Sequence, residues 1–266
     1  MPAPAWRLCL ETLKRVALPR GRAETGLFSL EGLRSMERAL RGGSPIREVL
    51  VSERFLTRTD ARHRRILDDV AAGAYPLRVA PDPEVDALTQ GRGLGDVFAL
   101  LAFPKPPAVE ELFGGTGRRL VVVGWNLNDP GNTGAVIRSA LAAGAAGFIA
   151  VGTTDPWHPK SVRTSMGSLF RLPVRHEEGL AWMDALPALG VETLASVCRD
   201  AEPLPDFVPR LNRLALFMGS EAFGLTDEVV ARLDRRITIP MPDQVDSYSI
   251  NAATAVLAYT LMRLPV

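Results

Sequence analysis

Histidine and cysteine are scarce in this chain of 266 residues, which contains three His and two Cys. The two cysteines, Cys9 and Cys198, lie far apart in the sequence, so nothing requires a disulfide, and a reducing cytoplasm is the expected compartment. The histidines form no ligand cluster with the cysteines, so we expect no metal site. No apolar run is long enough to cross a bilayer, and the first ten residues lack the apolar stretch of a secretory signal.

The sequence also lacks the motifs of several common enzyme classes. It contains neither the phosphate-binding pattern G-x-x-x-x-G-K-[ST] nor the nucleophile elbow G-x-S-x-G. A dinucleotide fold needs G-x-G-x-x-G at the start of its first helix. Gly91, Gly93 and Gly95 occur late in the N-terminal part instead, where we interpret them as a loop. These absences argue against nucleotide hydrolysis, serine hydrolase chemistry and dinucleotide-dependent redox chemistry.

Charge is distributed unevenly along the chain. The composition, 47% hydrophobic and 23% charged, is that of a soluble globular protein, and the net charge is only +1. Residues 1–65 nevertheless hold 14 Lys and Arg against 7 Asp and Glu, whereas residues 66–266 hold 17 against 23. A basic N-terminal part suggests an anionic partner such as a phosphate backbone. A solvated helix face, for example one carrying Arg58, Arg62, Arg64 and Arg65, explains a modest excess equally well.

Proline and glycine concentrate between Phe103 and Gly117, in the segment FPKPPAVEELFGGTG. We interpret this segment as a linker, with an N-terminal domain at residues 1–103, the linker at 104–117 and a C-terminal domain at 118–266. The N-terminal domain shows a mixed α/β pattern. Apolar periodicity predicts helices over 31–42 and 61–72, and strands over 46–52 and 77–80, with a short apolar run at 97–102.

The C-terminal domain alternates strands and helices more clearly. Apolar runs predict strands over 120–124, 147–151, 192–197, 214–218 and 236–239, with helices over 133–143 and 251–262. This alternation predicts a parallel sheet. Ligands of open α/β sheets bind beyond the carboxyl ends of the strands, so the loops that follow the strands are the candidate site.

Three polar segments that follow predicted strands stand out. The first, NLNDPGNTGAVIR, spans residues 126–138; the second, GSEAFG, spans 219–224; the third, IPMPDQVDSYSIN, spans 239–251. Glycine lets a backbone approach a ligand closely, as a binding loop requires. Helix capping by Ser, Thr, Asn and Glu explains each segment about as well when it is taken alone. A single loop therefore leaves the choice between a site and a capped helix open.

In this order, the three segments resemble the signature motifs of SpoU/TrmH-type RNA 2′-O-methyltransferases of the SPOUT superfamily. Other segments extend the resemblance. DPWHPKSVRTSMGSLFRLPV is similar to the family's stretch between its first two motifs, whereas AETGLFSLEGLRSMERAL and LGDVFALLAFP look like the start and end of its N-terminal substrate-binding domain. The match covers most of the chain. Three ordered motifs at suitable separations are specific to this family, although any one of them would not be.

The resemblance implies a fold, a cofactor and partners. It implies an α/β fold with a C-terminal parallel-sheet SPOUT domain tied in a deep trefoil knot, preceded by a small α/β RNA-binding domain like a ribosomal protein. The knot would hold S-adenosylmethionine, and the protein would work as a homodimer on RNA. The basic excess of residues 1–65 is consistent with such an RNA partner.

The resemblance also assigns candidate residues by position in the motifs. Those implied in catalysis are Arg138, Asn132, Glu221 and Asn251. Those implied around the methyl donor are Ser196, Gly219, Ile239, Met241, Ser249 and Ile250. Since the motifs contain no histidine or cysteine to act as a base, our hypothesis is that Arg138 stabilises the developing alkoxide electrostatically.

One motif departs from the family, and the substrate stays open. The family usually runs Ser-Leu-Asn directly after an acidic or amide residue, whereas this chain reads Asp246-Ser-Tyr-Ser-Ile-Asn251, with about two extra residues. Either Ser247 or Ser249 can therefore be the motif serine. Ribosomal RNA is the first choice of substrate because transfer-RNA members often lack the N-terminal domain. The alternatives are transfer RNA, methylation that confers antibiotic resistance, and an RNA-binding assembly factor without catalysis.

Overall fold

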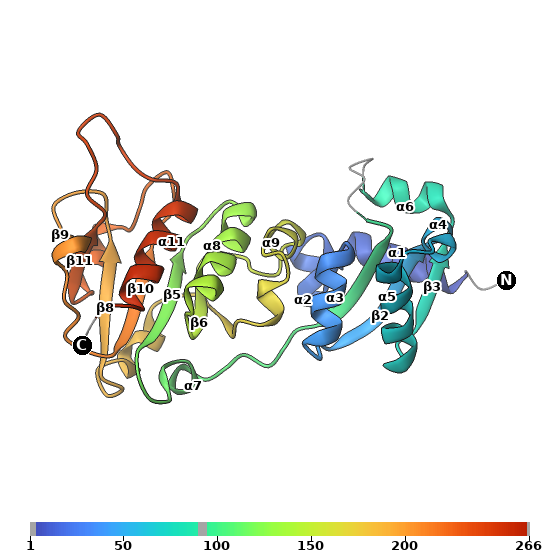
Figure 1. Ribbon diagram of the computed structural model, residues 1–266, viewed down its shortest axis with the longest axis horizontal. Helices are drawn as coiled ribbons and strands as arrows, with labels where there is room; N and C mark the ends of the chain where they lie inside the picture. The colour runs from blue at the N-terminus through green and yellow to red at the C-terminus, as the bar shows by residue number, and fades with distance from the viewer. Residues whose placement is uncertain (1–3, 90–94, 265–266) are drawn as a thin grey trace. The chain divides into compact units, whose positions relative to one another are not determined.

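The computed structural model describes residues 4–89 and 95–264 of the chain, which folds into two compact units (Figure 1). One unit comprises Met1–Lys105 and Trp157–Phe170, and the other comprises Pro106–Pro156 and Arg171–Val266. The sequence motifs place residues 157–170 in the C-terminal domain, but their contacts group them with the N-terminal unit. Trp157 and Phe170 pack on the buried ring of Phe28, with ring centroids 4.8 and 6.5 Å from it. Of the predicted glycine loop, Gly91 and Gly93 lie outside the described residues.

The N-terminal unit is built on a four-stranded mixed sheet in the order β1-β4-β2-β3. The sheet pairs β1 with β4 and β4 with β2 in antiparallel fashion, and β2 with β3 in parallel. The strands are β1 (Leu27–Glu31), β2 (Ile46–Ser52), β3 (Leu77–Ala80) and β4 (Val97–Ala102). The helices are α1 (Ala5–Val16), α2 (Pro19–Thr25), α3 (Leu33–Arg41), α4 (Glu53–Thr57), α5 (Ala61–Ala72), α6 (Asp82–Thr89), α9 (Pro159–Thr164) and a 3-10 turn at Ser168–Phe170.

Helix α1 closes one face of this sheet. Its residues Leu10 and Leu13 pack in one cluster with Phe98 and Leu100, which alternate along β4 and so point to the same side. Cys9 belongs to the same cluster and is buried. Burial raises the pKa of the Cys9 thiol, and the nearby Glu48 carboxylate raises it further, so the thiol stays protonated at neutral pH. The amphipathic face of α1 thus completes a core of its own in this unit.

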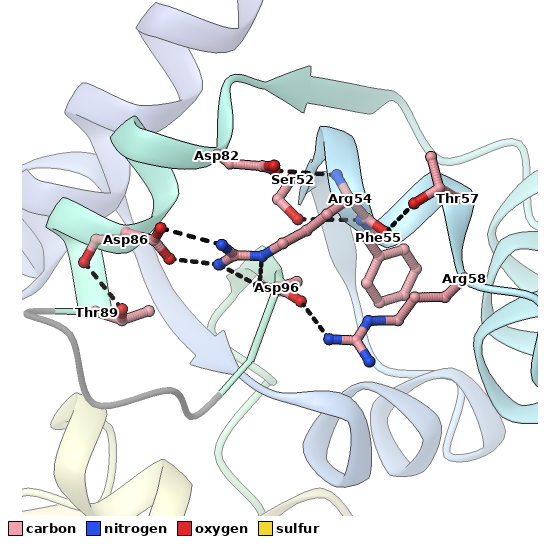
Figure 2. A network of polar contacts seen from close by, with 9 residues as sticks. All are labelled: Ser52, Arg54, Phe55, Thr57, Arg58, Asp82, Asp86, Thr89 and Asp96. Atoms are coloured by element: carbon pink, nitrogen blue, oxygen red, sulfur yellow. Dashed lines mark hydrogen bonds and ion pairs between the residues drawn. The ribbon is translucent and has the colours of Figure 1, made fainter.

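A network around Arg54 joins three elements of the N-terminal unit (Figure 2). The guanidinium of Arg54, on α4, donates from Nε to Asp96 Oδ1 at 2.8 Å and from Nη1 to Asp86 Oδ2 at 3.0 Å. Its backbone N–H donates to Asp82 Oδ1 at 3.0 Å. Arg58 adds an ion pair with the second oxygen of Asp96 at 3.2 Å. The network therefore ties α4 to the first residue and the middle of α6 and to the residue that precedes β4.

Replacing Arg54 by Gln is expected to lower the melting temperature at neutral pH by more than at acid pH. The Arg54 guanidinium holds the pKa of Asp86 below its usual value of about 4. The stability that this pair contributes is therefore present above about pH 4 and is lost as the pH falls through the folded-state pKa. Thermal unfolding followed by circular dichroism between pH 7 and pH 2.5 measures the difference. Arg47→Gln, at an exposed arginine, is the control, and an Arg54→Gln deficit that stays constant with pH would contradict the assignment.

The C-terminal unit contains a seven-stranded sheet whose strands pair only in parallel, in the order β7-β6-β5-β10-β8-β11-β9. The strands are β5 (Arg119–Trp125), β6 (Gly147–Val151), β7 (Val174–Glu177), β8 (Val191–Ser196), β9 (Glu202–Pro203), β10 (Arg213–Met218) and β11 (Arg235–Thr238). The helices are α7 (Val109–Phe113), α8 (Pro130–Ala143), α10 (Asp227–Ala231) and α11 (Ile250–Leu261), with 3-10 turns at Ala181–Ala185 and Leu204–Asp206. The parallel sheet expected from the alternating pattern is confirmed.

The strand order decides which loops of this sheet meet. Strands β5, β10, β8 and β11 are neighbours although they are far apart in the chain. Because they are parallel, the segments that follow them all emerge at one edge of the sheet. Helix α11 packs alongside α8 in the same unit (Figure 1). The start of α11 and the start of α8 can therefore contribute to the same site. Among residues 4–89 and 95–264, no helix is long and apolar enough to span a bilayer.

Candidate active site

A cavity of about 350 Å³ opens at the carboxyl edge of the parallel sheet in the C-terminal unit. Its walls come from three strand ends and one helix start. Residues 196–198 follow β8, residues 218–221 follow β10, Ile239 and Met241 follow β11, and residues 247–250 lead into α11. This volume lies within the range of about 300–1,000 Å³ that is typical of small-molecule sites.

The residues expected around a methyl donor meet in this cavity. The lining includes Ser196, Gly219, Ile239, Met241, Ser249 and Ile250. The strand order explains the convergence, because β8 lies between β10 and β11. Apolar side chains and hydroxyl groups therefore face one space from four segments. Such a mixed lining suits a ligand that has both a flat apolar part and polar groups.

The cavity also has walls that the motif comparison missed. Cys198 and Tyr248 line it, together with Met218 and Ser220. Cys198 comes two residues after Ser196, in the loop that directly follows β8, so its position after a buried strand was the available signal. Tyr248 belongs to the residues that are extra relative to the family pattern. The departure in the third motif is therefore located at the cavity itself.

The second motif forms a tight loop at the end of β10. Ser220 and Gly224 exchange backbone hydrogen bonds, with N–H to O distances of 3.2 and 2.8 Å. Gly219 has no room for a side chain, because an added Cβ would lie 2.1 Å from the carbonyl carbon of Gly224 and 2.3 Å from the nitrogen of Leu225. Both neighbours are backbone atoms of the same loop. Glycine at position 219 is therefore required for the loop to close.

Hydrogen bonds connect one side chain from each of the three motifs. Asn132 Nδ2 donates to Glu221 Oε2 at 2.6 Å, and Asn251 Nδ2 donates to Asn132 Oδ1 at 3.3 Å. Asn132 thus acts as donor to one partner and acceptor from the other, which fixes the orientation of its amide. Asn251 Oδ1 is buried and has no hydrogen-bond partner among the described residues. That oxygen is a remaining acceptor beside the cavity.

The first motif is held in place by the next loop of the sheet. The backbone N–H of Leu127 donates to Thr154 Oγ1 at 2.8 Å, and Thr154 Oγ1 donates to the Gly124 carbonyl at 3.1 Å. Thr154 is fully buried, so this bridge is protected from water. Asn126 adopts a left-handed conformation with φ of 49°, and its side chain accepts from the backbone N–H of Thr153. These contacts fix the position at which α8 begins, and therefore the position of Asn132 in its first turn.

Arg138 lies apart from the cavity lining. It sits on α8, six residues beyond Asn132, which is about 9 Å along the helix axis. Its side chain is exposed, and it forms no hydrogen bond or ion pair with any described residue. The structure of one chain therefore brings Asn132, Glu221 and Asn251 together but leaves Arg138 outside the group. An unpaired guanidinium in this position is available to a bound anion or to a second chain.

The third motif carries two serines, and the structure gives them different local roles. Ser249 caps the N-terminus of α11, where its Oγ accepts from the backbone N–H of Ala252 at 3.4 Å. Ser247 also lines the cavity but lies before the cap. The capping interpretation of the motif is thus confirmed for Ser249, and it coexists with a place in the cavity wall. Within the described part of the chain, no group of His, Cys, Asp and Glu could hold a metal ion.

The chain is similar to known methyltransferases along nearly all of its length. The model of the SpoU rRNA Methylase family matches residues 119–259. The 23S rRNA (uridine(2479)-2′-O)-methyltransferase of Streptomyces viridochromogenes is 30% identical, over 89% of this chain and 83% of that protein. The 23S rRNA (guanosine(2553)-2′-O)-methyltransferase RlmP of Bacillus subtilis is 27% identical, over 93% of both chains.

Solved structures show the same fold. A crystal structure described as an RNA 2′-O ribose methyltransferase superposes with a TM-score of 0.78 at 27% identity, over 96% of this chain and 95% of that one. The SpoU methyltransferase AviRb from Streptomyces viridochromogenes, crystallised in complex with AdoMet, superposes with a TM-score of 0.84 at 24% identity, over 98% of both chains. The architecture of both units is therefore shared with these proteins.

Proposed function

Because this chain belongs to the SpoU rRNA methylase family, we propose that it methylates a ribose 2′-hydroxyl of ribosomal RNA with S-adenosylmethionine as donor. The observation that carries the proposal is the hydrogen-bonded group of Asn132, Glu221 and Asn251. It joins all three motifs beside a cavity lined by every residue expected at the donor. A capped helix by itself would not require this convergence.

The cavity fits the donor chemically. Ile239, Met241 and Ile250 offer an apolar surface for an adenine ring, and the Gly219 backbone allows close approach. The hydroxyls of Ser196 and Ser249 are available to polar groups of the ligand. When bound, S-adenosylmethionine supplies an electrophilic methyl group on a sulfonium. The protein's own residues would then have to place the ribose oxygen in line with that methyl group. They would also have to stabilise the negative charge that develops on this oxygen as its proton is lost to water.

Asn132 and Arg138 are the residues we assign to that task. Asn132 is oriented by Glu221 and Asn251, so its position on the first turn of α8 is fixed before RNA binds. Arginine keeps its proton at neutral pH and is a poor base. We therefore assign Arg138 to electrostatic stabilisation of the developing alkoxide, which its unpaired guanidinium permits. An RNA phosphate or a second chain would complete its surroundings.

The proposal includes a homodimer and a knotted C-terminal unit, both implied by the family resemblance. Helix α11 supports the dimer, because Val256 and Tyr259 are 40% and 55% exposed on it. Phe223, in the second motif, is 83% exposed. Large apolar side chains that are exposed in this way are typical of a surface covered by another chain. Residues between 239 and 250 line the cavity, and the following helix α11 packs beside α8; this return of the chain to α8 is compatible with the knot.

Ribosomal RNA is the proposed substrate, and the proposal places the protein in the cytoplasm with it. Two relatives that match 93% and 89% of this chain are named as 23S rRNA methyltransferases, and these matches are long enough to include much of the N-terminal unit. The second candidate function is an RNA-binding assembly factor that lacks catalysis. It is favoured by the altered third motif, because Tyr248 stands in the wall of the donor cavity.

The proposal is tested by incubating the protein with labelled S-adenosylmethionine and total RNA from cells that lack it. We expect label on a single ribose of the large ribosomal RNA. Label in a base, or in transfer RNA, would overturn the reaction or the substrate respectively. Measurable donor binding without any incorporation would instead support the assembly factor. Light scattering on the same sample tests the dimer.

A further inference from the structure

Helix α3 of the N-terminal unit carries a row of three arginines on one face. Arg34, Arg38 and Arg41 are spaced four and three residues apart, so they lie on one side of the helix over about 10 Å. All three are exposed. The opposite face is buried through Ser35, Met36 and Ala39, which fixes the arginine face outward. We call these three residues the α3 arginine row.

Most other arginines of this unit are neutralised by a carboxylate. The pairs are Arg15 and Arg20 with Glu24, Arg54 with Asp86 and Asp96, Arg58 with Asp96, Arg62 with Glu37, Arg65 with Asp69, Arg78 with Glu48, and Arg163 with Glu31. By contrast, the α3 arginine row forms no hydrogen bond or ion pair with the described residues. Three of the four arginines at positions 58–65 are therefore paired with carboxylates. The unpaired positive charge that is clustered on one helix face lies on α3.

The acidic residue of α3 offsets only part of this charge. Glu37 is the single carboxylate of the helix, and it receives two hydrogen bonds from Arg62, at 2.8 and 2.7 Å. Those bonds lower the pKa of Glu37, which stays ionised and committed to α5. The charge of Arg41 also lowers the pKa of Glu37, although no hydrogen bond or ion pair joins the two residues. Most of the positive charge of the row therefore remains on the outer face.

The middle arginine of the row is held by the segment that packs on α3. Gly167 adopts a φ of 82°, and a Cβ added there would lie within 2.9 Å of the Cβ, Cγ and Cδ atoms of Arg38. The stem of Arg38 therefore rests against Gly167, and its guanidinium points to solvent. Gly42, at the end of α3, approaches the Phe170 carbonyl in the same way. The helix that carries the row, and the stem of Arg38, are therefore packed against residues 167–170, which reduces the entropy that this arginine loses on binding.

We propose that the α3 arginine row binds the sugar-phosphate backbone of the substrate RNA. This inference rests on the proposed function, because it names the protein surface that holds that RNA outside the cavity. Guanidinium groups match phosphate oxygens in geometry and charge, and a row of three spans a few successive phosphates. The contact would add affinity without reading sequence, because phosphates carry no base information. An acidic protein surface is the alternative occupant, and RNA binding whose salt dependence is unchanged by the α3 substitutions would favour it.

The test compares three triple variants in a binding assay without donor. The first replaces Arg34, Arg38 and Arg41 by Gln, and the second replaces them by Lys. The matched control, R7Q/R47Q/R64Q, removes the same charge from exposed arginines of the same unit that form no ion pair with a described residue. The probe is an unmodified transcript of bacterial 23S rRNA, and its affinity is measured between 50 and 300 mM salt.

We expect the α3 glutamine variant to flatten the salt dependence. The slope of log K against log salt should fall in magnitude by about 2–3, because each phosphate contact contributes about 0.7–0.9. The lysine variant should keep most of the slope, and the control should keep all of it. Equal losses for the α3 variant and the control would overturn the proposal, as would an unchanged slope for the α3 variant.

The outcome stays separate from that of the proposed function. Binding without donor does not depend on methyl transfer, so an inactive protein with the expected slopes would overturn only the proposed reaction. If methyl transfer occurs, but the α3 glutamine variant and the parent show the same slope of log K against log salt for RNA binding, only the role of the row would be overturned. Melting temperatures within a few degrees of the parent for all three variants show that folding is retained.

Discussion

Arg138→Ala is expected to slow methyl transfer by about 10²–10³-fold, which is the typical cost of removing one preorganised group that stabilises an oxyanion. Arg138 is exposed on α8 and forms no ion pair with the described residues, so its removal should leave the fold intact. Donor affinity should also be unchanged, because Arg138 does not line the cavity. Single-turnover rates with RNA in excess, together with donor titration by calorimetry, measure the two quantities.

Two further variants make this prediction specific. Arg138→Lys keeps the charge but loses the planar fork of donors, and we expect it to recover part of the rate. Arg210→Ala removes an exposed arginine elsewhere in the same unit and should keep the parent rate. A rate for Arg138→Ala within a few-fold of the parent, with RNA and donor bound normally, would show that the guanidinium has no part in the chemistry.

Gly219→Ala is expected to weaken donor binding by about 10- to 100-fold. The added methyl group would lie 2.1–2.4 Å from backbone atoms of Gly224 and Leu225, so the loop after β10 would have to open. Overpacking of this kind costs about 1–3 kcal/mol, and 1.4 kcal/mol corresponds to a factor of ten in affinity. Opening the loop would also disturb the backbone hydrogen bonds between Ser220 and Gly224. Calorimetric titration with S-adenosylmethionine measures the loss.

Gly179→Ala is the matched control for this substitution. Gly179 belongs to the same unit, and a Cβ added there meets no atom within 4 Å. Its donor affinity and melting temperature should equal those of the parent protein. If Gly219→Ala bound the donor as tightly as Gly179→Ala does, the loop after β10 would not be part of the donor site.

Three predicted strands, at residues 46–52, 77–80 and 147–151, have the same bounds in the structure. Residues 147–151 form a continuous apolar run that is buried at every position, as expected of a strand covered on both faces. The other two strands contain charged residues among their aliphatic ones. The short edge strands β7 (Val174–Glu177) and β9 (Glu202–Pro203) escaped prediction. Their residues are mostly half-buried, and β9 contains a proline, so neither shows a clear strand pattern.

Helix α1 was also missed, for a different reason. It begins after Pro4 without a side-chain cap, so no Ser, Thr, Asp or Asn signals its start. Its apolar face is buried by packing against β4, which is far away in the chain, so the local sequence does not show what covers it. The grouping of residues 157–170 with the N-terminal unit has the same origin. Trp157 and Phe170 pack on Phe28, a contact between residues that local periodicity cannot connect.

By itself, the sequence determined the alternation of strands and helices, the three ordered motifs and the residue types available for chemistry. These properties depend on local periodicity and on residue spacing, which a single chain displays directly. The tertiary structure alone decided which side chains meet. Asn132 reaches Glu221, 89 residues away, and Asn251, 119 residues away, because parallel pairing sets β5, β10, β8 and β11 side by side.

The charges of the N-terminal unit also show what the sequence determined and what only the structure decided. The sequence determined that residues 1–65 carry an excess of arginine. Folding decided that Arg54, Arg58 and Arg62 are neutralised, whereas the α3 arginine row forms no ion pair within residues 4–89 and 95–264. The physical reason is that an ion pair needs its two groups within about 4 Å, and that separation depends on how distant segments pack rather than on their order in the chain.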